Sequence, residues 1–270
     1  MTLDQINFAP LEQSQNAWKI ALRGVFKGKS LIIFILLMIV GLGSVFLAPP
    51  IIFIVLTIFF IRVAVVTNKI KTLAWRQFAA INGWQMDIQN VPMNLVPPSL
   101  VNSGHSQRCS EVVDAKFDNV DCDLMTYEFT IGSGKSSQTF YFTIADVVLP
   151  KTFPHIILDS NKNRGGFRNI PGGYENLKLE GDFDNYFKLY VVKGQEIDVL
   201  SIITPDVMQT LINADQQQDM EIYGNNLFFI GINDERSPAA MRTLLHSVSL
   251  LSAEILQRAQ TLNYTPPAQA

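Results

Sequence analysis

Hydrophobic and polar positions divide this chain into an apolar N-terminal part and a longer, patterned remainder. No charged residue occurs within residues 30–61, and Pro49-Pro50 interrupts this run near its middle. Its arms, residues 31–47 and 51–66, would each be about 25 Å long as helices, against about 30 Å for the hydrocarbon core of a bilayer. Because proline cannot continue a helix, the pattern predicts a transmembrane helical hairpin over residues 30–67. A re-entrant hairpin is the alternative.

Helical periodicity flanks the apolar run on both sides. Residues 11–28 predict an amphipathic helix, in which Lys19, Arg23 and Lys27 recur every four residues beside an apolar stripe. Such a helix either binds anionic headgroups or simply precedes the membrane span. Residues 68–82 are expected to continue as a helix into the rest of the chain.

From Cys109 onward, the period changes to the alternation that is typical of β-strands. Turn signals occur at Asp118-Asn119 and at Gly224-Asn225-Asn226. Thr204-Pro205 and Ser237-Pro238 are helix starts, and the second opens a long C-terminal helix to about residue 262. Strands are predicted over residues 109–117, 122–131, 137–149, 153–158, 177–180 and 186–192, with a hairpin over 220–232. The fold class is therefore α+β: a mainly antiparallel β-sheet domain packed with helices, following the transmembrane hairpin.

Charge predicts which side of the membrane each part occupies. The chain has a net charge of −3, yet basic side chains flank both ends of the apolar run. Because basic flanks stay cytoplasmic, we expect a multi-pass protein of the inner (plasma) membrane with both termini in the cytoplasm. The predicted domains are a cytosolic segment with the basic helix (1–29), the hairpin (30–67), a cytosolic α+β domain (68–262) and a flexible tail (263–270).

Two groups of residues are candidates for binding. The basic side chains expected to face the lipid bilayer are Lys19, Arg23, Lys27, Lys29, Lys69 and Lys71. A Gly-rich loop over residues 161–175 is the candidate contact for a membrane-protein or cytosolic protein partner, through Lys162, Arg164, Phe167, Arg168 and Tyr174. A solvated loop without a partner is the alternative. The acidic excess after residue 80 argues against nucleic-acid binding.

The sequence contains no recognisable catalytic motif. His105, His155 and His246 have no second histidine or cysteine at ligand spacing, so neither a metal site nor a cofactor is predicted. Glu180, Asp182 and Asp184 form an acidic turn. They offer a weak cation site, or the carboxylates of a hydrolase if they line a cleft.

Several strings resemble a widespread class of uncharacterised bacterial membrane proteins. These are HIILDSNKN (155–163), LKLEGDFDNYFKLYVVKG (177–194) and DVLSIITPDVMQTLI (198–212). The resemblance implies a two-helix hairpin anchor before a cytosolic α+β domain of unknown function. It implies no catalytic residues.

These patterns favour binding over catalysis. The leading hypothesis is a membrane-anchored binding or scaffold module on the cytosolic face. The alternatives are a membrane-bound hydrolase that uses the acidic turn, and an accessory subunit of an envelope or transport assembly.

Overall fold

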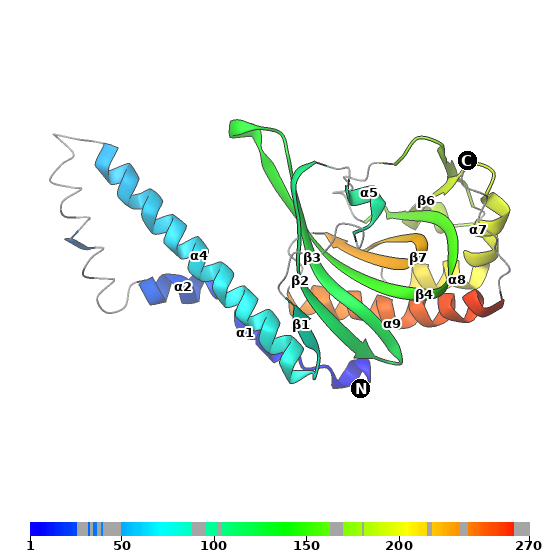
Figure 1. The fold of residues 1–270 in the computed structure, drawn as a ribbon, viewed down its shortest axis with the longest axis horizontal. Coiled ribbons are helices and arrows are strands. Elements are labelled where there is room, and N and C mark those ends of the chain that lie inside the picture. Colours follow the sequence, from blue (N-terminus) through cyan, green and yellow to red (C-terminus); the bar gives the residue numbers. More distant parts are fainter. Residues whose placement is uncertain are drawn as a thin grey trace. The chain divides into compact units, whose positions relative to one another are not determined.

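The computed structural model describes residues 1–25, 32, 35, 36, 39, 50–87, 96–101, 104–162, 170–179, 181–214, 218–232 and 237–261. The chain forms two compact units (Figure 1). A helical unit spans Asn7–Ile81, and an α+β unit combines Met1–Ile6 with Asn82–Ala270. The boundary between them follows Ile81, whereas the sequence pattern suggested residue 67. The predicted tail after residue 262 lies outside the described residues.

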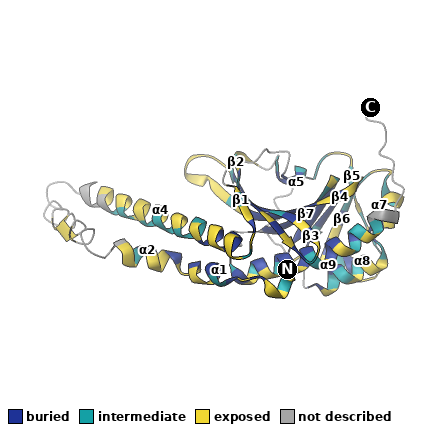
Figure 2. Ribbon diagram, turned by 60° about the horizontal axis from the view of Figure 1, so that its bottom comes forward, coloured by how far each residue is buried: buried dark blue, intermediate teal, exposed yellow. Residues whose placement is uncertain are grey.

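The helical unit consists of α1 (Ala9–Ser14), α2 (Ala17–Val25) and α4 (Pro50–Ile81), and α1 and α2 both pack along α4 (Figure 2). The helix predicted over residues 11–28 is therefore two helices, separated by a turn at residues 15 and 16. Alanines form the buried side of α2, whereas Trp75 and Phe78 are the bulky buried side chains of α4. The ring of Phe8 lies 5.5 Å from that of Phe78 and joins the start of this unit to α4.

The predicted transmembrane hairpin over residues 30–67 is not supported. Among the described residues, none of the helices combines the length and the apolar character that are needed to cross a membrane. Most of the first arm lies outside those residues. The second arm is the beginning of α4, which runs on to Ile81 because neither proline nor glycine occurs between Ile51 and Ile81. A multi-pass arrangement is accordingly not supported.

The α+β unit confirms the predicted fold class, with an antiparallel sheet and a long C-terminal helix. Its helices and strands include most of those predicted, in the same order, together with short elements that the sequence did not predict, and the strand expected over residues 177–180 ends at residue 177. They are η1 (Leu3–Gln5), β1 (Gln85–Asp87), α5 (Pro98–Val101), β2 (His105–Phe117), β3 (Val120–Ile131), η3 (Gly134–Ser136), β4 (Gln138–Ser160), β5 (Tyr174–Leu177), α6 (Phe183–Tyr186), β6 (Phe187–Val192), α7 (Glu196–Ile202), α8 (Pro205–Asn213), β7 (Asp219–Ile232) and α9 (Pro238–Thr261).

Strand β4 holds the sheet together. The strand order is β1-β2-β3-β4-β6-β5, and β7 also pairs with β4. The first half of β4 pairs with β3 and its second half with β6, whereas β7 accompanies it from Phe142 to Leu158. Since a strand has only two edges, β3 and β6 share one edge of β4 and β7 occupies the other. One long strand thereby joins the β2–β3 and β5–β6 pairs into a single sheet.

Two strand predictions are wrong because a bulge bends β4 and β7 without ending either strand. Residues 153–158 are not a separate strand but the end of β4, and residues 220–232 are not a hairpin but the single strand β7. Val148 pairs with Asn226 and Phe153 with Gly224, so residues 149–152 of β4 face only Asn225. The bulge bends both strands together. Gly224, with a φ of 61°, accommodates this bend instead of reversing the chain.

The turn predicted at Asp118-Asn119 is confirmed, and it carries an additional role. Both residues have positive φ, 47° and 61°, as a two-residue type I′ hairpin requires. The Asp118 carboxylate accepts hydrogen bonds from the Leu3 amide at 3.2 Å and from the Ser249 hydroxyl at 2.7 Å. The Asp118 amide donates to the Met1 carbonyl at 3.0 Å. One turn residue therefore fastens the N-terminal η1 and helix α9 to the tip of the β2–β3 hairpin.

The core of this unit lies on both faces of the sheet. Helix α9 packs against β3, β4 and β7 through an apolar stripe that is fully buried: Met241, Leu244, Leu245, Val248, Leu251 and Ile255. A second cluster joins Leu100 of α5 to aromatic side chains of the sheet, where the rings of Phe129 and Phe142 stack 5.4 Å apart. Helix α5 and helix α9 lie on opposite sides of the sheet (Figure 1).

Candidate functional site

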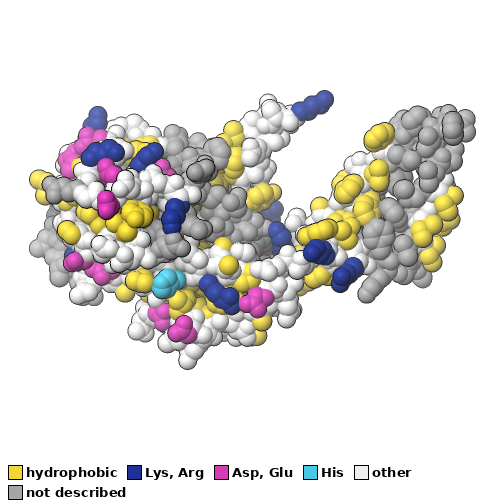
Figure 3. Space-filling view, turned by 180° about the vertical axis from the view of Figure 1, so that it is seen from behind, with side chains coloured by type: hydrophobic (Ala, Val, Ile, Leu, Met, Phe, Trp, Pro, Cys, Tyr) yellow, Lys and Arg dark blue, Asp and Glu magenta, His cyan; other side chains and the backbone are white. Residues whose placement is uncertain are grey.

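The first half of α4 exposes large apolar side chains over one broad face. Phe53 is 69% exposed and Phe60 is 63% exposed. Others recur at helical spacing on the same face, namely Ile54, Ile58, Ile61 and Val65. Hydrophobic side chains are visible along this helix in the space-filling view (Figure 3). We call these six residues the apolar face of α4.

Basic side chains follow the apolar face along the helix. Arg62, Lys69 and Arg76 are exposed and recur every seven residues, which places them on one side of α4. Lys71 is half-buried and lies on a different side. Helix α4 contains no aspartate or glutamate. The helix therefore changes along its length from a wholly uncharged segment to a basic one.

Hydroxyl groups on α4 are bonded within the helix itself. The Thr57 hydroxyl donates to the Phe53 carbonyl at 2.7 Å, and the Thr67 hydroxyl donates to the Val63 carbonyl at 2.8 Å. Because both bonds are made inside the helix, neither hydroxyl depends on water for a partner.

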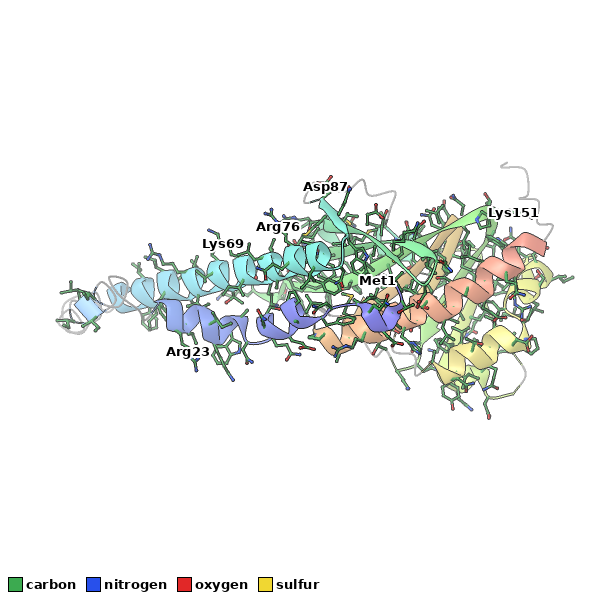
Figure 4. All side chains as sticks on the ribbon, turned by 90° about the horizontal axis from the view of Figure 1, so that it is seen from below. Met1, Arg23, Lys69, Arg76, Asp87 and Lys151 are labelled. Atoms are coloured by element: carbon green, nitrogen blue, oxygen red, sulfur yellow. The ribbon has the colours of Figure 1, made fainter. Side chains whose placement is uncertain are left out.

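Helix α2 presents a second amphipathic surface. Trp18 is 53% exposed, and the Lys19 ammonium lies 5.7 Å from the centre of its ring. Arg23 is also exposed, but it projects from α2 on the side opposite to Lys69 and Arg76 of α4 (Figure 4). The structure thus does not gather the predicted basic residues into one surface. Lys27 and Lys29 lie outside the described residues.

Two residues of the predicted partner loop, Lys162 and Tyr174, lie among the described residues. Lys162 is exposed after β4, whereas Tyr174 is half-buried in β5. Arg164, Phe167 and Arg168 lie outside the described residues. The hydroxyl of Tyr174 points to the imidazole of His155 and belongs to a buried network that the sequence did not predict.

This buried network joins Ser99, His155, Tyr174 and Glu221. The Glu221 side chain is fully buried, and its Oε1 lies 2.7 Å from His155 Nε2. The Ser99 amide donates to Oε1 at 3.2 Å, and the Ser99 hydroxyl donates to Oε2. A carboxylate only accepts, so Nε2 donates to Glu221, while Nδ1 lies within hydrogen-bond distance of the Tyr174 hydroxyl. Burial, followed by the charges of Glu221 and Tyr223, raises the pKa of Tyr174 to about 12 and keeps it a donor.

We call this network the clamp, because its hydrogen bonds hold elements of the fold together. It is not arranged as a nucleophilic relay. A serine nucleophile needs a histidine base on its hydroxyl, whereas Ser99 and His155 both bond to the same carboxylate. The four residues come from α5, β4, β5 and β7, so the network ties a short helix to three strands. Two sequence signals were present: His155, an isolated histidine next to an apolar strand segment, and Glu221, a glutamate between Met220 and Ile222.

The acidic turn that motivated the hydrolase alternative makes local contacts. Asp184 pairs with Lys178 at 3.3 Å and accepts from the Leu179 amide at 3.4 Å. Asp182 is exposed and its carboxylate lies 3.4 Å from the Asn185 amide group. Glu180 lies outside the described residues. These contacts hold the turn before α6 together and do not favour acid–base catalysis.

A cavity of about 330 Å³ lies elsewhere in the α+β unit, at the β2–β3–β4 strands. Carboxylates dominate its polar lining: Asp114, Asp121, Asp123 and Asp146. Asp146 is 3% exposed; its Oδ2 accepts a hydrogen bond from Asn226 at 2.7 Å, and its Oδ1 has no partner among the described residues. Burial raises the pKa of Asp146 to about 7, against the lowering effect of the Asn226 hydrogen bond and with a further increase from the Asp123 charge.

Comparison with known proteins identifies one similar solved structure. The crystal structure of the mycobacterial trehalose monomycolate transport factor A, TtfA, matches with a TM-score of 0.49 and 9% sequence identity. The match covers 73% of this chain and 98% of that chain. No model of a protein family and no curated protein sequence matches.

Proposed function

We propose that this protein is a membrane-tethered binding module, whose tether is the apolar face of α4 inserted into lipid. The observation that carries the proposal is the exposure of six large apolar side chains on one face of one helix. Contiguous apolar surface of this kind is rare in water and is found where lipid or a protein partner covers it.

Three features of α4 and its neighbour α2 favour lipid over a protein partner. The uncharged segment 50–61 is followed along the helix by Arg62, Lys69 and Arg76, and this order suits acyl chains followed by phosphate headgroups. The Thr57 hydroxyl is satisfied within the helix and needs no water. On α2, exposed Trp18 beside Lys19 has the composition of a membrane interface.

The length of the uncharged segment limits how deep the tether reaches. Helix α4 from residue 50 to residue 61 rises about 18 Å, less than the hydrocarbon thickness of about 30 Å. We therefore propose insertion of α4 into the bilayer and not a crossing by this segment. In this proposal the α+β unit supplies the binding part of the module.

Vesicle flotation tests the tether directly. The full-length protein is mixed with phosphatidylcholine vesicles, with or without phosphatidylglycerol, and floated through a density gradient. We expect the wild type to float with both, and more completely with the anionic lipid. The double variant Phe53→Asp/Phe60→Asp should remain at the bottom, because each carboxylate within the hydrocarbon core costs about 2.5–3.5 kcal/mol.

Two further variants separate lipid insertion from general effects. Arg62→Gln/Lys69→Gln/Arg76→Gln should lose only the gain from anionic lipid, because its apolar face is intact. Ile197→Asp is the matched control, since Ile197 is 85% exposed but belongs to the α+β unit. Flotation of Phe53→Asp/Phe60→Asp at the wild-type level would contradict the proposal.

A second candidate is an accessory subunit of an envelope or transport assembly. The observation in its favour is on α7, where Ile197 and Leu200 expose apolar side chains three residues apart, 85% and 42% respectively. The name of TtfA refers to transport, but a TM-score of 0.49 carries no functional argument. Photocrosslinking from position 197 in native membranes should give one discrete adduct if this candidate is right. A matched probe at Lys188, exposed on β6, should give none.

A further inference from the structure

We propose that the cavity beside Asp146 is a binding site for a small organic ammonium ion with an aliphatic body. The inference is independent of the membrane tether. It rests on the positions of carboxylates in the sheet, on a buried oxygen without a partner and on the remaining lining of the cavity.

Three of the four carboxylates form a row across the sheet. Asp114 is the register partner of Asp123, and Asp123 is the register partner of Asp146. Side chains of directly opposed residues leave the sheet on the same face, so three like charges occupy neighbouring positions on three adjacent strands. Such an arrangement disfavours the folded state in the absence of a cation. Asp121, the fourth, is already paired with Lys116 at 2.7 Å.

Asp146 supplies an unsatisfied acceptor at the buried end of this row. Asn226 occupies Oδ2, while Oδ1 is inaccessible to solvent and has no hydrogen-bond partner in the described part of the chain. A buried acceptor in this state costs about 1–3 kcal/mol, and a cation bound in the adjacent cavity would offset that cost electrostatically. Burial raises the pKa of Asp123 as well, and the Asp114 charge raises it further. A bound cation would offset all of these penalties together.

The geometry favours an ammonium group over a metal ion. Within the described ranges, there is no group of three His, Cys, Asp or Glu side chains close enough to hold a metal ion. An ammonium group offers several donors in different directions and tolerates wider spacing between acceptors. Val120, Val148 and Leu256 supply apolar lining, which suits an aliphatic body. A volume of about 330 Å³ is at the lower end of the range for small-molecule sites.

The test is a calorimetric titration of the full-length protein with 1,4-diaminobutane, repeated with MgCl₂ and CaCl₂ alone. We expect saturable binding of the diamine. Asp146→Asn should weaken it by at least about tenfold, because it removes the carboxylate at the buried end of the row. Asp198→Asn is the control, since Asp198 is an exposed carboxylate on α7, away from the cavity lining.

Loss of binding in Asp146→Asn cannot be attributed to unfolding if the variant is at least as stable as the wild type. Urea unfolding of each sample tests this, and Asp123→Asn provides a second variant of the same row. No saturable heat with the diamine would overturn the proposal. So would equal affinity in Asp146→Asn and wild type, or binding of Mg²⁺ or Ca²⁺ in the absence of diamine binding.

Discussion

The imidazole of His155 lies 2.7 Å from the carboxylate of Glu221, and both side chains are shielded from water by the sheet around them. Glu221 pairs in register with Ile157, so His155 is its diagonal neighbour on β4. The pair is the centre of a network that reaches Ser99 on one side and Tyr174 on the other. Its members are separated by up to 122 residues along the chain.

Truncation of His155 tests the clamp. We expect His155→Ala to lower the free energy of unfolding by about 2–4 kcal/mol, because the buried Glu221 carboxylate would lose one of its hydrogen-bond partners. Tyr174→Phe removes only the outer hydrogen bond and should cost about 1 kcal/mol. Urea unfolding followed by circular dichroism measures both. A cost below about 0.5 kcal/mol for His155→Ala would show that the network does not stabilise the fold.

Replacement of Asp118 tests the hairpin tip. Asp118→Ala removes the acceptor of the Leu3 amide and of the Ser249 hydroxyl and places alanine at positive φ. We expect a loss of about 2–3 kcal/mol and faster amide exchange at Leu3. Asp121→Ala, two residues past the turn, removes only an exposed pair with Lys116 and should cost less than about 1 kcal/mol. Similar costs for the two variants would contradict this assignment.

Stability should depend on pH through Asp146. Its pKa is raised by burial from 3.8 to about 7 in the folded state, so between these values the folded protein binds more protons than the unfolded chain. The contribution of Asp146 to the free energy of unfolding is therefore fully present below about pH 4. It decreases by roughly 4 kcal/mol in total as the pH rises to about 7. Asp146→Asn carries no ionisable group there and should lack this loss.

The measurement is urea unfolding of wild type and Asp146→Asn at several pH values from 4 to 8. The stability difference in favour of the variant should grow over this interval and then level off. Groups that titrate in both proteins cancel in the difference. A difference that is constant with pH would show that Asp146 titrates normally despite its burial.

Gly104 should tolerate no side chain. A Cβ at this position would lie 2.5 Å from the Thr130 carbonyl oxygen and 2.8 Å from the Phe129 ring, and the carbonyl belongs to the backbone of β3. We expect Gly104→Ala to destabilise the protein by about 1–3 kcal/mol. Gly172→Ala is the control, because a Cβ added there would have nothing within 4 Å and should change stability little. Thermal unfolding of the two variants side by side distinguishes them.

Local patterns in the sequence predicted a large part of the fold. Alternation predicted β2, β3 and the first half of β4, and the Asp118-Asn119 pair predicted the turn between β2 and β3. Proline and a capping residue predicted the starts of α8 and α9. Each of these signals involves residues only a few positions apart in the sequence. Such residues are close in space whatever the rest of the fold does.

The sequence was less informative for segments whose structure depends on residues far away along the chain. Gly224-Asn225-Asn226 has the composition of a hairpin turn, yet the continuous ladder with β4 makes it a bend. The hydroxyl of Tyr174 bonds to His155, a contact that no spacing in the sequence indicated. The uncharged run predicted a spanning hairpin, whereas the second arm continues to Ile81 within α4.

The sequence by itself determined the α+β class, the apolar run and its basic flank, because periodicity and charge are properties of short segments. Only the tertiary structure decided that Glu221 meets Ser99 and His155, and that Asp114, Asp123 and Asp146 align across three strands. Those encounters depend on strand register over long sequence separations. A shift of one residue would turn each side chain to the opposite face, so no local pattern could have specified them.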